Sequence, residues 1–309
     1  MINLPWTEKY KSKNIEEMVL NDTFRQKMNN LIESQNLNNM IFQGSTGIGK
    51  SLLAKCLGYK LYDREDYNKM IIDYKDYKDK KEEIQNIYKM LFPKTKYKYR
   101  LLIVDDVDNY DDKIQNQILS CFNESVRIIF TCTNLENILE GLQSNCTIMK
   151  MNLTPQELTP KLMDILKKEK KNYTEEGLNL LCNYSKCDVR NSINLLQQIC
   201  NRFNDVTIDN IMLSCNIPTF IVSETIMNHI VKKEISNIFE IIKTLEGYSQ
   251  EDILLGLMYY LKFTIKIKED IKIIVNKHII KCLYDMSKTK NSDLSLLCCF
   301  IEIDKEITM

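Results

Sequence analysis

An eight-residue segment constrains the fold of this chain more than any other part: Gly44-Ser45-Thr46-Gly47-Ile48-Gly49-Lys50-Ser51. It fits the pattern G-x-x-x-x-G-K-[ST], and three of the chain's eight glycines lie in its first six positions. The apolar residues 40–42 before it predict a buried strand, and residues 51–62 after it predict a helix, which is the context that this pattern requires. Glycines let backbone amides close around phosphate oxygens, and the N-terminus of the following helix adds positive potential. We therefore predict a phosphate-binding loop in which Lys50 reaches the β- and γ-phosphates of a nucleotide and Ser51 offers its hydroxyl to Mg²⁺.

Strand and helix patterns alternate between residues 40 and 151. Apolar runs predict further strands at 70–72, 101–104, 127–133 and 147–151, and helical spacing predicts helices at 81–91 and 113–122. The run 101–104 is continuously apolar, as is typical of a strand that is buried on both faces. Strands separated by helices imply a doubly wound α/β sheet.

The pattern becomes helical after residue 151. Thr154-Pro155-Gln156-Glu157 combines a capping box with proline at the first helical position, so a helix should begin there. Helices are expected at 155–170, 174–184 and 188–203, and from 219 to the end with a turn at Gly247. An interruption at 216–218 separates the two helical regions. The sequence thus predicts three domains, at 1–151, 152–216 and 217–309.

The composition argues against several classes of protein. The 42 basic and 42 acidic side chains cancel, which argues against strong binding of nucleic acid by the isolated chain. Eleven cysteines without a C-x-x-C pair, and only two histidines, argue against a zinc site. The first ten residues lack a signal-peptide pattern, and the apolar runs are far shorter than the roughly 20 residues that span a bilayer. We expect an intracellular, non-secreted protein that does not enter a membrane and whose cysteines are mostly reduced core residues.

Polar side chains follow the predicted central strands. Asp105 and Asp106 come directly after the run 101–104, at the edge of the sheet where a phosphate group would lie. We expect Asp105 to hold Mg²⁺ through water and Asp106 to orient the attacking water. Asn134 follows the next strand and is expected to touch the γ-phosphate or that water. Arg190, at the start of a predicted helix, could reach back to the phosphates. The alternatives are a simple acidic loop, an asparagine in a turn and a solvated helix arginine.

Motifs in the first half of the chain resemble those of replication factor C small subunits, which are AAA+ proteins of sliding-clamp loaders. Leu4-Pro5-Trp6-Thr7-Glu8-Lys9-Tyr10 resembles the family's opening L-P-W-V-E-K-Y-R-P, and the residues Asn38 to Gly44 resemble P-H-L-L-F-Y-G. Asp105-Asp106-Val107-Asp108 resembles D-E-A-D, and Thr133-Asn134 corresponds to the sensor-1 asparagine.

The second half continues the resemblance in the same order. Cys187-Asp188-Val189-Arg190, followed by Asn194-Leu195-Leu196-Gln197, is similar to G-D-M-R-R-A-L-N-L-L-Q, which makes Arg190 the sensor-2 arginine. The segment from Gly247 to Ile253 resembles G-Y-S-x-x-D-I in the family's last domain.

The resemblance implies an α/β P-loop AAA+ domain, an all-α lid domain and an all-α collar domain that joins subunits. It also implies an ATP-binding subunit of a five-membered hetero-oligomeric arc, which uses ATP and Mg²⁺ to place a clamp of the PCNA type on primer–template DNA. In the family, the residues that match Thr7, Glu8, Lys9 and Tyr10, and the position that matches Val19, lie along the adenine. The neighbouring Trp6 is expected to be a packing anchor.

Three departures from the family pattern stand out. Its S-R-C motif, which carries an arginine finger for the neighbour's ATP, is Ser144-Asn145-Cys146 here. Asp106 replaces a glutamate and is shorter by one methylene, about 1.5 Å. A DNA-contacting arginine pair falls on Leu119 and Ser120. The run Lys94, Lys96, Lys98 and Arg100, interleaved with Tyr97 and Tyr99, could contact phosphate instead or form a solvated strand edge.

Two further interpretations stay open. The chain could be a structural subunit that binds nucleotide and hydrolyses little, or another AAA+ replication or repair ATPase such as an origin-binding initiator or a branch-migration helicase. Abundant Lys, Asn and Ile suggest an AT-rich genome, cellular or viral, so the nucleus, the cytoplasm and a viral replication site all remain open.

Overall fold

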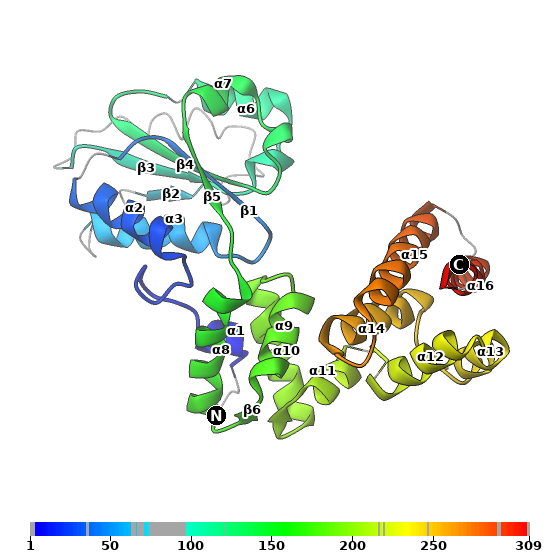
Figure 1. Cartoon of the computed structure of the whole chain (residues 1–309). Coiled ribbons are helices and arrows are strands. Elements are labelled where there is room, and N and C mark those ends of the chain that lie inside the picture. Colours follow the sequence, from blue (N-terminus) through cyan, green and yellow to red (C-terminus); the bar gives the residue numbers. More distant parts are fainter. Residues whose placement is uncertain are drawn as a thin grey trace. The chain divides into compact units, whose positions relative to one another are not determined.

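The computed structural model describes residues 4–34, 37–62, 66, 71–73, 97–120, 122–215, 217–218, 220–245, 247–288 and 292–307 (Figure 1). The chain forms two compact units, Met1–Gln197 and Gln198–Met309. The predicted helix 81–91, Lys94 and Lys96 lie outside the described residues. The division into three domains stays a prediction.

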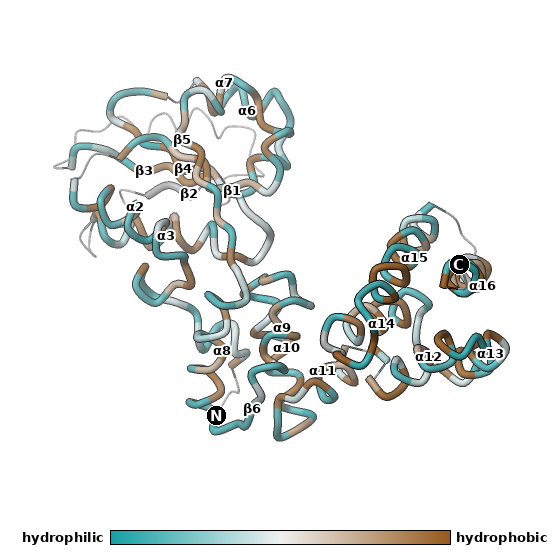
Figure 2. The backbone as a smooth tube through the Cα atoms, in the orientation of Figure 1, coloured by the Kyte–Doolittle hydropathy of each residue, from teal (hydrophilic) through white to brown (hydrophobic). Residues whose placement is uncertain are grey.

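A five-stranded parallel sheet forms the centre of the first unit, in the order β2-β3-β4-β1-β5. The strands are β1 (Met40–Gly44), β2 (Ile71–Asp73), β3 (Arg100–Val104), β4 (Val126–Cys132) and β5 (Thr147–Met151). Met40 of β1 lies opposite Ile129 of β4 on one side and Thr147 of β5 on the other. This is the α/β parallel sheet that the sequence predicted. Figure 2 shows the strands as the apolar centre of this part of the chain.

Helices cover both faces of the sheet. They are α2 (Asp22–Glu33), α3 (Lys50–Leu61), α6 (Asp112–Leu119) and α7 (Glu140–Ser144), with the 3-10 turns η2 (Val107–Asn109) and η3 (Leu135–Asn137). The short helix α1 (Trp6–Lys9) lies beside α8 (Pro155–Glu169) instead (Figure 1). Phe42 on β1 packs with buried residues of α2 and α3, whereas Phe130 on β4 packs with residues of α6 and α7. Side chains alternate between the faces of a strand, so each strand contributes to both cores.

The helix predicted at 113–122 ends early. α6 stops at Leu119, and Phe122 lies beyond it, stacked on Phe130 with ring centroids 6.2 Å apart. The side chain of Asn123 accepts a hydrogen bond from the Ser125 N–H at 2.7 Å. Such an asparagine turn competes with helix continuation.

Three longer helices follow the sheet, and the last of them continues past the boundary of the first unit at Gln197. They are α8 (Pro155–Glu169), α9 (Glu175–Tyr184) and α10 (Val189–Arg202), with the short strand β6 (Asn172–Tyr173). The Thr154 N–H donates to Glu157 Oε2 at 2.7 Å, which confirms the predicted capping box at the start of α8. Trp6 is 8% exposed, and its backbone N–H donates to Gln197 Oε1 at 2.9 Å. The prediction that Trp6 is a packing anchor is therefore confirmed.

The described residues of the second unit beyond α10 are almost entirely helical. They form β7 (Asp205–Val206), α11 (Ile208–Ser214), α12 (Phe220–Lys232), α13 (Ile235–Thr244), α14 (Gln250–Phe263), α15 (Glu269–Lys288) and α16 (Ser292–Ile307). Leu257, Ile279 and Phe300 belong to one buried core that joins α12 to α16. The predicted turn at Gly247 is present, with φ +96°. None of the helices in the described ranges has both the length and the apolarity that a membrane crossing demands.

Candidate functional site

The predicted phosphate loop connects the end of β1 to the start of α3. Gly47 and Gly49 have φ values of +67° and +107°, a region that favours glycine. A side chain at Gly44 is excluded for a different reason, because a Cβ there would lie 2.5 Å from the carbonyl oxygen of Met151. The tight path of the loop thus accounts for all three glycines of the motif.

Lys50 is folded back onto this loop. Its side chain is 6% exposed, and Nζ donates to the carbonyl oxygens of Gly44 at 2.8 Å and Ser45 at 2.9 Å. Burial lowers the pKa of Lys50, and the nearby acidic groups, Asp106 foremost, oppose that shift. The half-buried Ser51 follows Lys50 in the first turn of α3. The loop therefore places a cation and a hydroxyl at the N-terminus of one helix.

A threonine on β4 connects the two predicted acids. Asp105 is 2% exposed, and its Oδ1 accepts a hydrogen bond from Thr131 Oγ1 at 3.1 Å. The same Thr131 oxygen accepts the backbone N–H of Asp106 at 2.9 Å. Asp106 has a left-handed backbone, φ 51° and ψ 49°, which aspartate tolerates better than most residues. Thr131, which is fully buried, therefore orients the carboxylate of Asp105 and holds the backbone of Asp106.

Asp108 positions the segment that carries Asn134. Its Oδ2 accepts the backbone N–H groups of Thr133 at 3.0 Å and Asn134 at 2.9 Å. Asn134 is exposed at the end of β4, where η3 begins. The carboxylate of Asp108, after β3, thus fixes the backbone position of Asn134, the predicted sensor-1 residue after β4.

The start of α10 lies against the crest of the phosphate loop. A Cβ built on Gly47 would be 1.9 Å from Asp188 Oδ1, so the Asp188 carboxylate occupies the space beside this glycine. The same oxygen accepts the Asn191 N–H at 2.8 Å and caps the helix. Arg190, exposed in the first turn of α10, is therefore close in sequence to a residue that touches the loop.

The residues that the resemblance placed along an adenine separate into two groups. Val19 and Ile48 line one narrow gap, so Val19 does lie beside the phosphate loop. Lys9 Nζ and Tyr10 Oη instead reach Glu169 Oε1 on α8, at 2.6 and 2.5 Å. Lys9, and then Tyr10, hold the pKa of Glu169 below its ordinary value.

Thr7 is half-buried and Glu8 is exposed, and both lie on the short helix α1. Glu8 is 3.5 Å from Lys11 Nζ, in an exposed ion pair. The structure thus anchors α1 to the helices that follow the sheet, and an adenine contact by residues 7–10 stays a prediction.

The site uses three side chains whose roles sequence reasoning missed. Thr131 and Asp108 fix the acids and Asn134, and Asp188 meets Gly47. Asp108 and Asp188 belong to the motifs 105–108 and 187–190, so the sequence marked both positions as candidates for the site. Thr131 carried none, since a threonine within a strand is ordinary.

Asn145, which stands where the family pattern has an arginine finger, makes a contact with its own helix, α7. Asn145 Nδ2 donates to the Gly141 carbonyl oxygen at 2.7 Å and so closes α7. Arg127 lines the same hollow of about 590 Å³ as Asn145, although it is far upstream in sequence. Its guanidinium donates to the Leu37 carbonyl oxygen at 2.5 Å and lies 3.8 Å from the ring centroid of Tyr99. The guanidinium of Arg127 is thus held by contacts within its own domain.

The two positions that replace the family's DNA-contacting arginine pair have contacts within the chain. Leu119 packs against the core on the α6 face of the sheet, and the Ser120 hydroxyl donates to the Gln117 carbonyl oxygen at 2.5 Å. Lys98 lies 4.9 Å from the ring centroid of Tyr99. A DNA contact by the run 94–100 stays a prediction.

The parallel sheet, the phosphate loop and the acidic strand end, followed by helices, form the fold of an AAA+ P-loop domain. Solved structures agree on the fold: the Thermotoga maritima RuvB Holliday junction branch migration motor matches with a TM-score of 0.54 and 11% identity, over 82% of this chain and 90% of that one. No protein-family model matches the chain.

Among curated proteins the chain is similar to replication factor C small subunits. It is 26% identical over 316 residues to a protein of Acanthamoeba polyphaga mimivirus that is named for the replication factor C small subunit, covering 99% of this chain and 98% of the relative. It is also 26% identical over 264 residues to Homo sapiens replication factor C subunit 5, covering 82% and 77%. The predicted resemblance is therefore confirmed.

Proposed function

We propose that this chain is an ATP-binding small subunit of a replication-factor-C-type clamp loader, which helps to load a sliding clamp onto primed DNA during replication. The similarity to the mimivirus protein extends over 99% of the chain, so it includes the helical second unit as well as the nucleotide site. The observation that carries the proposal is a buried Lys50, folded onto the phosphate loop, that is near the charges of Asp106 and Asp105, two acids that both hydrogen-bond Thr131.

The donor set fits Mg²⁺, which prefers hard oxygen ligands and usually binds through one or two carboxylates together with nucleotide phosphates. Ser51 supplies a hydroxyl beside the loop, and Asp105 supplies a carboxylate that one threonine hydrogen bond orients. When bound, Mg²⁺ would neutralise charge that develops on the phosphates.

The chain's own residues would divide the remaining work. The amides of residues 44–51 would cradle the phosphates, and Lys50 would exchange its two carbonyl contacts for phosphate oxygens. Asp106 and Asn134 would orient the attacking water, while Arg190 would reach the phosphates from α10. Val19 would contact the adenine, together with residues 7–10.

We also propose the assembly and domain roles that this function requires. Residues 1–151 would bind nucleotide, 152–216 would form the lid, and 217–309 would form a collar that joins the chain to other loader subunits in a hetero-pentamer. The partners would be a PCNA-type clamp and primer–template DNA, inside the cell.

The first test is nucleotide binding. Lys50→Ala should abolish tight binding of a fluorescent ATP analogue in titrations with Mg²⁺, because it removes the cation from the loop. Lys60→Ala is the matched control, since Lys60 lies on the same helix but forms an exposed ion pair with Glu16. Equal affinities of Lys50→Ala and wild type would refute the phosphate-loop assignment.

The second test is reconstitution with candidate loader subunits, followed by clamp loading on primed DNA. Co-assembly with loader subunits and a clamp would distinguish this function from that of a branch-migration motor, whose fold is shared. A chain that assembles only with itself would contradict the proposal.

A structural subunit with little hydrolysis is the second candidate, and one observation favours it. Asn145 has no charge, and its amide is engaged with Gly141, so this chain would not complete a neighbour's active site. Single-turnover hydrolysis in the assembled complex, measured site by site, would separate the two candidates.

A further inference from the structure

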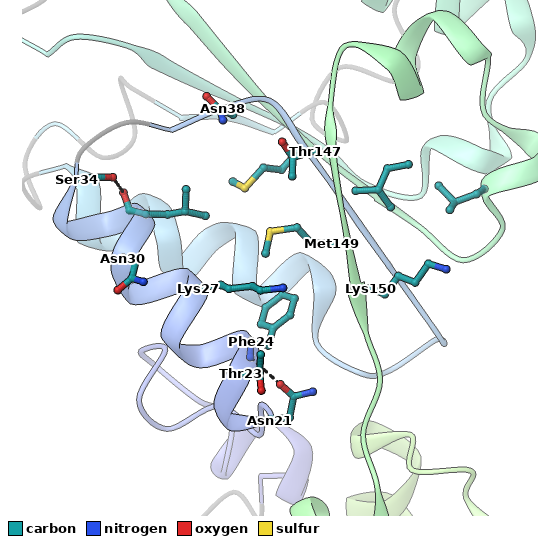
Figure 3. Close-up of a pocket in the computed structure, with 14 residues that line it drawn as sticks. Asn21, Thr23, Phe24, Lys27, Asn30, Ser34, Asn38, Thr147, Met149 and Lys150 are labelled. Carbon is teal, nitrogen blue, oxygen red and sulfur yellow. Dashed lines mark hydrogen bonds between the residues drawn. The ribbon is translucent and has the colours of Figure 1, made fainter.

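A groove lies at the edge of the sheet, apart from the nucleotide site. It has a volume of about 1070 Å³ and is lined by one face of α2, by β5 and by the start of η3. None of the residues assigned to the nucleotide site lines it. Figure 3 shows Phe24, Lys27 and Met149 directed into the space between α2 and β5.

The backbone of β5 is oriented to accept another strand. The Thr147 N–H donates to the Asn39 carbonyl oxygen at 2.8 Å, on the β1 side. Because backbone groups alternate in direction along a strand, the N–H and C=O groups of Ile148 and Lys150 point away from β1. Within the described part of the chain, β5 is the last strand on this side of the sheet. Such an edge is a template for pairing with a further strand.

Apolar side chains flank that edge on both faces. Phe24 and Met149 lie on the α2 face, where they belong to the buried core. Ile148, which is 37% exposed, and Leu135 line the groove on the opposite face. A strand added beside β5 would therefore find apolar side chains on both faces of the sheet, one set for each row of its own side chains.

Among the described residues, the formal charges that line the groove all have the same sign. Lys27 and Lys150 line it, and no aspartate or glutamate of the described ranges does. The acidic residues of α2, Asp22 and Glu33, are outside the lining. A second copy of the chain docked here would bring like charges together, which disfavours self-pairing, whereas an acidic segment would be attracted.

We propose that this groove binds an extended, acidic and apolar segment of a partner protein, which adds a sixth strand to the sheet beside β5. Backbone hydrogen bonds to Ile148 and Lys150 would supply affinity, and side-chain pockets would supply specificity. Lys27 and Lys150 lie on opposite faces of β5 (Figure 3). Two carboxylates that contact them must therefore be at positions that differ by an odd number, such as i and i+1 or i and i+3, since successive side chains of a strand alternate in direction.

The test is a selection of random twelve-residue peptides, displayed on phage, against the immobilised full-length chain. Enriched peptides should contain alternating apolar residues and two acids at odd spacing. A labelled synthetic copy is then titrated by fluorescence anisotropy. Lys27→Glu combined with Lys150→Glu should weaken it roughly three- to thirtyfold and favour a peptide with lysines in place of the acids.

The matched control reverses two exposed lysines elsewhere in the same unit, Lys113→Glu and Lys167→Glu, and should leave binding unchanged. Pairing with β5 is tested by methylating alternate backbone nitrogens of the peptide. Methylation in one register should abolish binding, and methylation in the other should be tolerated, because only one set of N–H groups faces β5.

Three outcomes would overturn the proposal. The first is no enrichment, or enriched peptides that bind the charge-reversed variant equally well. The second is equal loss of binding from both methylated peptides, which indicates adsorption without strand pairing. The third is a dimer of the chain in analytical ultracentrifugation that Ile148→Lys converts to a monomer, which would assign the groove to a second copy.

Discussion

Gly47→Ala tests the contact between the phosphate loop and α10. A Cβ at this position would lie 1.9 Å from Asp188 Oδ1 and 2.3 Å from its Cγ, so the carboxylate has to move. Alanine in the left-handed conformation costs roughly 1–2 kcal/mol. Displacing Asp188 removes the cap on Asn191, which costs roughly 0.5–2 kcal/mol. Together these effects predict a loss of roughly 1.5–4 kcal/mol in the free energy of unfolding.

A double-mutant cycle separates the two contributions. After Asp188→Ala there is no carboxylate to displace, so Gly47→Ala should then cost only the backbone strain, roughly 1–2 kcal/mol. The assay is urea unfolding, followed by circular dichroism and by the fluorescence of Trp6, the single tryptophan. Gly247→Ala is the control for strain alone, because φ is +96° there and nothing lies within 4 Å. Equal costs of Gly47→Ala with and without Asp188 would refute the contact.

Four further predictions follow from the site and its supports. Asp106→Glu should preserve or raise ATP turnover in the assembled complex, and a sharp fall in phosphate release would show that the left-handed backbone suits aspartate alone. Asn145→Arg should accelerate single-turnover hydrolysis at the adjoining site, where a finger contributes roughly 10³–10⁵ in rate, and an unchanged rate would contradict this. The pKa of Glu169 is lower in the folded protein than in the unfolded chain, where it is about 4.3. This difference stabilises the fold fully at pH values above about 4.3, and the stabilisation is lost as the pH falls through the folded-state pKa. Glu169→Gln should therefore be less stable than wild type in urea at pH 7, and the difference should shrink as the pH falls below about 4, whereas a constant difference would exclude this linkage. Gln115→Met should cost about 2–4 kcal/mol of stability, because the buried amide bonds the backbone of Tyr110, Asn137 and Leu139; thermal melts equal to wild type would disprove it.

The conformation of the loop 44–51 and the strands of the sheet were predictable because their signals are local. The motif 44–51 needs glycines where φ is positive, and the run 101–104 needs apolar residues where a strand is buried on both faces. Each requirement acts on a few consecutive residues, so the pattern is visible in the chain itself. The early end of α6 was not predicted, since the asparagine turn at Asn123 competes with a helix of ordinary spacing.

By itself the sequence predicted the five strands of the sheet, the helices α3, α6, α8, α9 and α10, the glycine loop 44–51, the acids after β3 and the similarity to replication factor C small subunits. It gave no sign of α1, α2 or α7. Only the tertiary structure decided which side chains meet. Thr131 bridges Asp105 and Asp106 because parallel β3 and β4 pair in register, and Asp188 reaches Gly47 because α10 packs against the loop. Such contacts join residues that are far apart in the chain. Their geometry depends on strand register and helix packing, and no local pattern of residue types encodes either one.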